Sequence, residues 1–143
     1  GGHGKAEPAM AADIAARTDF DILSLHIGTN ALWDKAYPER LEAFLKTILA
    51  AHPTKPVILA SPILRFEKPG IPPPALATCR AAMAEVAARV AKDHPNLVFL
   101  PGEELIRRPD SLNTDMIHIP DHGAVEYAEN LAPVLSRILT NRR

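Results

Sequence analysis

Apolar residues follow two patterns along the chain. Short, nearly continuous apolar runs are typical of strands buried on both faces, and they predict strands over residues 21–26, 56–60 and 96–100. Longer segments, with apolar residues every three or four positions, predict helices over residues 7–16, 38–51, 74–92 and from about 121 onward. Strands that alternate with helices are typical of βαβ units, so the pattern predicts an α/β fold with a parallel sheet.

The apolar stripes indicate which face of each helix should turn toward the core. For the helix at residues 38–51 the stripe is Leu41, Phe44, Leu45, Ile48 and Leu49, and for the helix at residues 74–92 it is Leu76, Cys79, Met83, Val86 and Val90. The stripe of the last helix is expected to consist of Val125, Ala128, Ala132, Leu135 and Leu139. In a parallel sheet covered by helices, functional groups gather in the loops at the carboxyl ends of the strands. Chemistry is therefore expected in the loops that follow the predicted strands.

The length of 143 residues fits a single domain spanning 1–143. Only three strands are predicted, whereas a sheet has about five on average. We therefore expect the sheet to be incomplete at the N-terminus, with further structure ahead of residue 1. That structure would be a preceding segment of the same protein, a second chain, or another copy of this chain in a homo-oligomer.

Composition excludes several classes of function. A content of 47% apolar and 23% charged residues supports a packed core. A net charge of −1 and only 5% aromatic residues argue against a nucleic-acid partner. No apolar run reaches the roughly 18 residues that span a bilayer. Cys79 is the only cysteine, which leaves the compartment open between the cytoplasm and a bacterial exterior.

One loop with chemical potential follows the predicted strand at residues 21–26. Gly28 lets the backbone turn sharply and approach a ligand closely. The Asn30 side chain supplies a neutral N–H donor of the kind that stabilises a developing oxyanion. The same two residues also suit an ordinary turn in which they serve backbone geometry alone. The loop by itself leaves both interpretations open.

A second loop, at residues 115–123, precedes the last predicted helix. Asp115 and His118 are three positions apart, so the carboxylate can bond one ring nitrogen and leave the other as a general base. A turn-capping aspartate and a merely exposed histidine are the alternatives. A metal site would gather four side chains of this loop, but their order matches no common ligand spacing, so no metal is expected. These four are Asp115, His118, Asp121 and His122.

Taken together, in this order and on an α/β pattern, the two loops resemble the SGNH (GDSL-type) hydrolase superfamily. Its members carry a Gly-Asp-Ser-Leu-like segment, then a glycine loop, then Gly-x-Asn-Asp, and finally Asp-x-x-His. Residues 28–30 match the third motif, with Ala31 where Asp is usual, and residues 115–118 match the fourth. The initial GGHGKAEP resembles the glycine loop, which places the oxyanion glycine at Gly2, with Gly4 as the alternative.

The resemblance implies a three-layer α/β/α fold with a flavodoxin-like parallel sheet. It also implies a serine esterase or lipase-like acylhydrolase with a Ser-His-Asp triad. His118 would be the general base and Asp115 would orient it, while the Asn30 amide and a backbone N–H at Gly2 would form the oxyanion hole. No metal or organic cofactor is implied.

The nucleophile of that triad has no counterpart in the chain, because nothing corresponds to the Gly-Asp-Ser-Leu segment. Ser24 lies within a predicted strand, Ser111 in the loop before Asp115, and Ser136 in the last helix. Ser61 follows a predicted strand but lacks a glycine-rich elbow. The serine is therefore expected upstream of this chain, and the chain alone is expected to be inactive.

The substrate that the resemblance implies is a carboxylic ester, such as an O-acetylated carbohydrate or a short acyl ester. Three other functions stay open. One is a noncatalytic flavodoxin-like module for binding or assembly, and another is a metal-dependent hydrolase that uses the last loop. The third is an acyltransferase on the same site, in which an alcohol replaces water in the second half of the reaction.

Overall fold

The computed structural model describes residues 3–68, 70 and 72–140. It divides into two compact units. The first contains the described residues of Gly1–Pro62 together with Ala75–Leu100, and the second contains those of Ile63–Pro74 and Pro101–Arg143. Each unit is described by itself.

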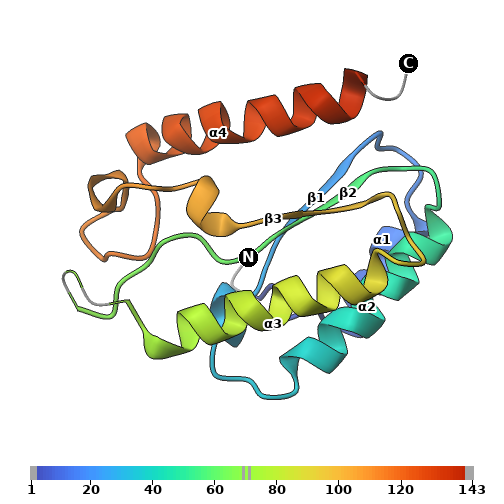
Figure 1. Ribbon diagram of the computed structural model, residues 1–143, viewed down its shortest axis with the longest axis horizontal. Coiled ribbons are helices and arrows are strands. Elements are labelled where there is room, and N and C mark those ends of the chain that lie inside the picture. The colour runs from blue at the N-terminus through green and yellow to red at the C-terminus, as the bar shows by residue number, and fades with distance from the viewer. Residues whose placement is uncertain (1–2, 69, 71, 141–143) are drawn as a thin grey trace. The chain divides into compact units, whose positions relative to one another are not determined.

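A parallel sheet forms the centre of the first unit, as predicted (Figure 1). Its strands are β1 (Leu23–His26), β2 (Val57–Ala60) and β3 (Leu97–Leu100), in the order β1-β2-β3. Each strand ends at the predicted residue but begins one or two residues later, where the register with its neighbour starts. All three strands therefore run in one direction and present their carboxyl ends at one edge of the sheet.

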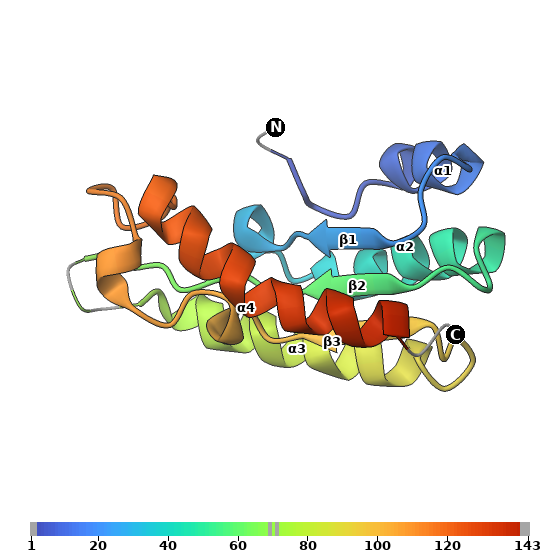
Figure 2. The same ribbon diagram turned by 90° about the horizontal axis from the view of Figure 1, so that it is seen from above.

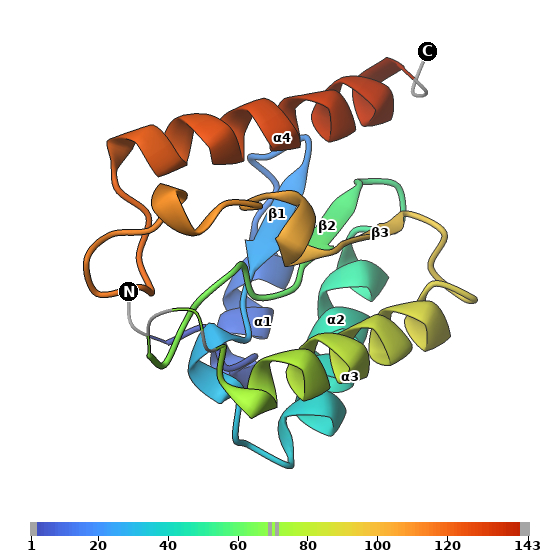
Figure 3. The same cartoon turned by 60° about the vertical axis from the view of Figure 1, so that its left-hand side comes forward.

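Three helices of this unit cover one face of the sheet (Figure 3). They are α1 (Pro8–Ala16), α2 (Tyr37–Ala51) and α3 (Pro74–Val90). The predicted stripes of α2 and α3 are buried, from Leu41 to Leu49 on α2 and from Leu76 to Val90 on α3. They pack against the strand positions that face them: Leu25, Val57, Leu59 and Leu97. Burial of this apolar surface is the main stabilisation of the unit.

The second unit consists of the long helix α4 (Asp121–Thr140) and the loops that precede it. Two short 3-10 turns, η2 (Gly102–Glu104) and η3 (Pro109–Ser111), lie in these loops, which fold back beside the start of α4 (Figure 2). A small apolar cluster holds the loops together, formed by Phe66, Ile106 and Leu112. No helix in the described part of the chain combines the length and apolar character needed to cross a bilayer.

The predicted inner stripe of α4 is wrong. Val125 and Leu139 are 57% and 51% exposed, whereas Gly123 and Glu126 are buried. Polar contacts set this rotation: the Glu126 carboxylate accepts a hydrogen bond from the backbone N–H of Arg107 at 3.1 Å. One turn further on, the Asn130 amide donates to the Leu105 carbonyl oxygen at 3.0 Å.

Gly123 lets the start of α4 lie directly against η3. A Cβ atom on Gly123 would stand 2.2 Å from the Ser111 carbonyl oxygen, a separation that real Cβ atoms essentially never show. Because Ser111 is itself buried, its carbonyl group has little room to retreat. The loop that leads to Asp115 and His118 therefore packs against α4 at a position that only glycine can occupy.

We expect Gly123→Ala to lower the free energy of unfolding by about 1–3 kcal/mol, the usual cost of overpacking. Helix propensity alone would predict a gain of about 1 kcal/mol for the same change. Urea unfolding measures the difference. Glu129→Ala, at an exposed position of the same helix, is the control and should stay within about 0.5 kcal/mol of the parent. A stabilised Gly123→Ala variant would contradict the close approach to Ser111.

Candidate active site

The loop after β1 requires a glycine. Gly28 has φ 101°, a left-handed conformation that L side chains rarely adopt. A Cβ atom there would stand 2.9 Å from the Met83 Sδ atom and 3.1 Å from the Tyr37 hydroxyl oxygen. The turn therefore packs directly onto side chains of α2 and α3, and it leads into the 3-10 turn η1 (Thr29–Ala31) that carries Asn30.

The N-terminal glycine segment lies beside this loop. The Gly28 N–H donates to the Gly4 carbonyl oxygen at 3.0 Å, and Gly4 has a left-handed φ of 75°. The Asn30 side-chain amide donates to the His3 carbonyl oxygen at 2.7 Å. Two of the predicted motifs are thus adjacent, and the bond to His3 uses one of the two amide N–H groups of Asn30. Gly2, the predicted oxyanion glycine, lies outside the described residues.

Asp115 and His118 form a closely bonded pair in the loop before α4. The His118 Nδ1 atom lies 2.7 Å from the Asp115 Oδ2 atom. The other carboxylate oxygen accepts the backbone N–H groups of Ile117 and His118, both at 2.9 Å. Three bonds thus fix the carboxylate, and the carboxylate assigns the ring proton to Nδ1. The imidazole is 76% exposed, so its Nε2 edge is open to a reacting partner.

The same contacts determine the charge of Asp115. The backbone N–H of His118, its ring, and the backbone N–H of Ile117 lower the pKa of the Asp115 carboxyl from 3.8 to about 2. Hydrogen bonds that favour the charged form produce this direction of shift. The carboxylate is therefore ionised at neutral pH and stabilises a positive charge on the neighbouring imidazole.

The alternative metal site would also need Asp121 and His122 as ligands, and His122 has another partner. His122 uses its Nε2 atom to donate to the Asp110 carbonyl oxygen at 2.9 Å. Within the described ranges, no three His, Cys, Asp or Glu side chains gather as ligands for a metal ion. The observed partner of Asp115 is the imidazole of His118.

The serines of the chain lie where the sequence pattern predicts them. Ser61 follows β2 and is 3% exposed, and Ser111 is 1% exposed at the end of η3. Ser24 makes a contact that the sequence did not reveal: its Oγ atom lies 2.6 Å from the His26 Nε2 atom. Residues two apart on a strand point to the same side, so strand geometry accounts for this pair.

Two residues missed by the sequence analysis support the site. Glu126 anchors the loop of the second unit through the Arg107 N–H, and it could have been noticed only as a charged residue close to the expected stripe. Tyr37 is 2% exposed, and its buried side chain packs against Gly28. Its position at the start of α2 carries no sequence signal for that contact.

Comparison with known proteins defines the fold. No protein-family model matches the chain, and no curated protein matches it either. Among solved structures, the salicylyl-acyltransferase SsfX3 from a tetracycline biosynthetic pathway is similar over 94% of the chain, with 23% identity and a TM-score of 0.78. A protein described as a GDSL-like lipase from Bacteroides ovatus is similar over 97%, with 22% identity and a TM-score of 0.76. A peptidoglycan O-acetylesterase is similar over 94%, with 16% identity and a TM-score of 0.77.

These similarities establish that the chain has an α/β fold of the SGNH (GDSL-type) hydrolases. The resemblance in the sequence motifs is thereby confirmed at the level of the fold. The chain spans 42% of the length of each of the three structures. At sequence identities of 16% to 23%, the similarity shows a shared fold alone.

The Asp115 carboxyl is expected to titrate with a midpoint near 2 in the folded protein. The pKa of Asp115 is lower in the folded protein than the ordinary 3.8, so ionised Asp115 stabilises the fold. This stabilisation is complete above pH 3.8 and is lost as the pH falls through about 2. His118→Ala should raise the midpoint only partway, since two backbone donors stay in place. Carboxyl ¹³C NMR measures the midpoint.

His122→Ala is the matched control for this titration, because His122 bonds the Asp110 carbonyl group and not Asp115. Its Asp115 midpoint should equal that of the parent. A parent midpoint at the ordinary value, or a full return to it in His118→Ala, would contradict the bonding described for the loop.

Proposed function

We propose that this chain supplies the general base and part of the oxyanion hole of a serine acylhydrolase, and that the nucleophilic serine lies on a segment outside it. The observation that carries the proposal is the Asp115 carboxylate, which two backbone N–H groups fix in place and which accepts a hydrogen bond from the His118 Nδ1 atom. A merely exposed histidine would need no such support. The adjacency of Asn30 and the glycine segment adds a second, independent feature of the same chemistry.

The proposed reaction begins with attack of the serine Oγ atom on the ester carbonyl carbon. The serine proton passes to His118 Nε2, and the same proton is then given to the leaving alcohol as the acyl-enzyme forms. Asp115 keeps the imidazole oriented and stabilises its protonated form, because the low pKa of the carboxyl keeps it ionised. Water then attacks the acyl-enzyme by the reverse of these steps and releases the acid.

The oxyanion formed in each half of the reaction is stabilised by N–H donors. Asn30 contributes its amide, which the bond to His3 holds in a defined orientation. A backbone N–H of the glycine segment, at Gly2 or Gly4, contributes a second donor. Each donor of this kind is worth on the order of a hundred- to thousandfold in rate, because it is in place before the charge develops.

An external nucleophile fits the surroundings of the serines in this chain. Ser61 and Ser111 are buried, and Ser24 is within β1. Each of the three similar structures is more than twice as long as the match. Their names point to carboxylic esters as the substrate class, including salicylyl and O-acetyl groups. If an alcohol replaces water in the second step, the same machinery becomes an acyltransferase.

In the full-length protein, His118→Ala should lower kcat/KM for 4-nitrophenyl acetate by at least about a thousandfold, because the proton relay is lost. Asn30→Ala should lower it by about a hundred- to thousandfold. His122→Ala is the control and should leave the rate within about twofold of the parent. A His118→Ala variant with near-parental turnover would refute the assigned base, and a rate abolished by a chelator would favour the metal-dependent alternative.

The position of the nucleophile has a direct test. A fluorophosphonate probe should label a serine outside these 143 residues in the full-length protein, and mass spectrometry of the labelled peptide identifies it. Labelling of Ser24, Ser61, Ser111 or Ser136 would show that the nucleophile has been misplaced. A full-length protein that neither reacts with the probe nor hydrolyses esters would favour the noncatalytic module.

A further inference from the structure

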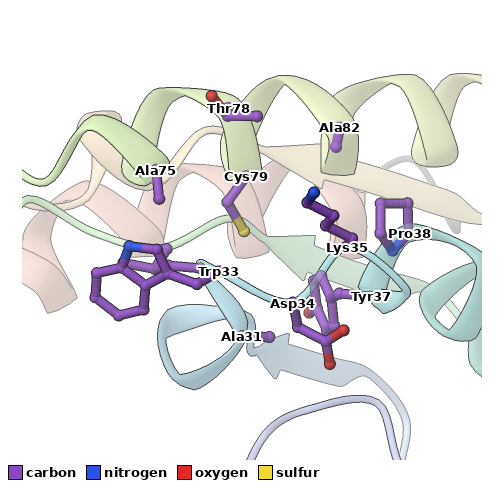
Figure 4. Close-up of a pocket in the computed structure, with 11 residues that line it drawn as sticks. Ala31, Trp33, Asp34, Lys35, Tyr37, Pro38, Ala75, Thr78, Cys79 and Ala82 are labelled. Atoms are coloured by element: carbon purple, nitrogen blue, oxygen red, sulfur yellow. The ribbon is translucent and has the colours of Figure 1, made fainter.

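An apolar cavity of about 390 Å³ lies in the first unit, on the α3 side of the loop that follows β1 (Figure 4). We propose that this cavity binds a small, neutral aromatic molecule that carries a hydrogen-bond acceptor oxygen. None of the residues that line the cavity belongs to the proposed triad, so the proposal does not depend on that triad. Its walls include Ala31, Leu32, Trp33, Tyr37, Cys79 and Ala82.

The cavity has the size and lining of a small-molecule site. Ligand pockets range from about 300 to 1,000 Å³ and combine apolar walls with a few polar groups. An engineered apolar cavity of about 150 Å³ already accommodates benzene, so this one has room for a substituted ring. The residues that α3 contributes to the lining are small, which leaves this space open: Ala75, Thr78, Cys79 and Ala82.

Trp33 favours an aromatic occupant. Its side chain is 65% exposed, which is unusual for so large an apolar surface, and it lines the cavity. Aromatic rings prefer offset or edge-to-face contact with an indole, which adds to the burial of area. A ring held against Trp33 and the small residues of α3 would cover surface that is now exposed to solvent.

Tyr37 favours an acceptor oxygen on that occupant. The Tyr37 hydroxyl group is buried and has no hydrogen-bond partner among the described residues. A buried hydroxyl without a partner is costly, and a ligand oxygen would remove that cost. Burial also raises the pKa of Tyr37 well above its ordinary value, so the group stays protonated and able to donate.

The charges at the cavity favour a neutral ligand. Asp34 and Lys35 both line it and carry opposite charges. Asp34 is already engaged with the Arg40 guanidinium at 2.6 Å. Asp34 and Arg40 therefore compensate one another, and water screens the charge of Lys35, which is exposed. The other walls are mostly apolar and offer an ionised ligand no buried group of opposite charge. Figure 4 shows Cys79 pointing from α3 toward the loop, and its thiol donates to the Gly28 carbonyl oxygen at 3.9 Å.

The chain supplies its own reporter for this site, because Trp33 is its only tryptophan. The full-length protein is titrated with acetophenone, a neutral ring with one acceptor oxygen, and with ethylbenzene, which lacks the oxygen. The Trp33 indole N–H resonance is followed in ¹H–¹⁵N spectra. If the segment outside this chain adds tryptophans, Trp33→Phe assigns the resonance. Saturable shifts are expected with both compounds, with acetophenone bound about fivefold more tightly through the Tyr37 hydroxyl.

Three variants make the test specific. Ala82→Leu, which fills the cavity, should abolish binding, and Ala81→Leu, at an exposed position of α3, should leave it unchanged. Tyr37→Phe should remove the preference for acetophenone while ethylbenzene binds as before. Because the hydroxyl lacks a partner in the free protein, Tyr37→Phe should not lower the free energy of unfolding.

Several results would overturn the proposal. Absence of saturable shifts at millimolar ligand, or unchanged binding in Ala82→Leu, would show that the cavity is not a small-molecule site. Equal affinities of the two compounds in the parent would refute the contact with Tyr37. Trp33 shifts that follow protein concentration without ligand would assign the cavity to a second copy of the chain instead.

Discussion

One carboxylate determines what the second unit can do. Asp115 accepts two backbone N–H groups and one ring N–H, and these bonds shape the loop and orient the imidazole at the same time. The loop in turn is held against α4 at Gly123 and by the Glu126 carboxylate. Local structure and chemistry therefore share the same contacts. A change that loosens the loop would also release the ring from the orientation on which the proposed role of His118 as a base depends.

In the first unit, a single residue likewise combines several contacts at the edge of the sheet where the strands end. Gly28 packs onto Tyr37 and Met83, bonds to Gly4, and starts the short turn that presents Asn30. The Asn30 amide and the glycine segment are thus positioned by the hydrophobic core and by two hydrogen bonds, one from the Gly28 N–H to Gly4 and one from the Asn30 side chain to His3. These contacts hold the Asn30 amide in place, as the proposed oxyanion hole requires, because donors fixed in advance stabilise charge without reorganisation.

Much of the fold followed from periodicity, because strand and helix patterns depend on local residue spacing. The strand ends and the stripes of α2 and α3 were predicted correctly, since burial against a sheet selects apolar residues. The face of α4 was predicted incorrectly, because polar bonds to Arg107 and Leu105 fix its rotation and hydropathy does not register them.

Contacts within one loop of the candidate site were predictable, and contacts between distant segments were not. The spacing of Asp115 and His118 predicted their bond, because three residues of a turn bring such side chains together. The bond from Asn30 to His3 and the support from Tyr37 were not predictable, since both join segments far apart in the sequence or buried against one another. Contacts of this type depend on tertiary packing, which periodicity does not encode.

The position of β1 in the sheet has a consequence of its own. Among the strands of the described part of the chain, β1 pairs with β2 alone, so it lies at an edge of the sheet. A strand added there in parallel would run alongside Leu23–His26 and finish level with the turn at Gly28. An edge strand of this kind accepts further backbone pairing, so β1 is the position at which an incoming segment would extend the sheet.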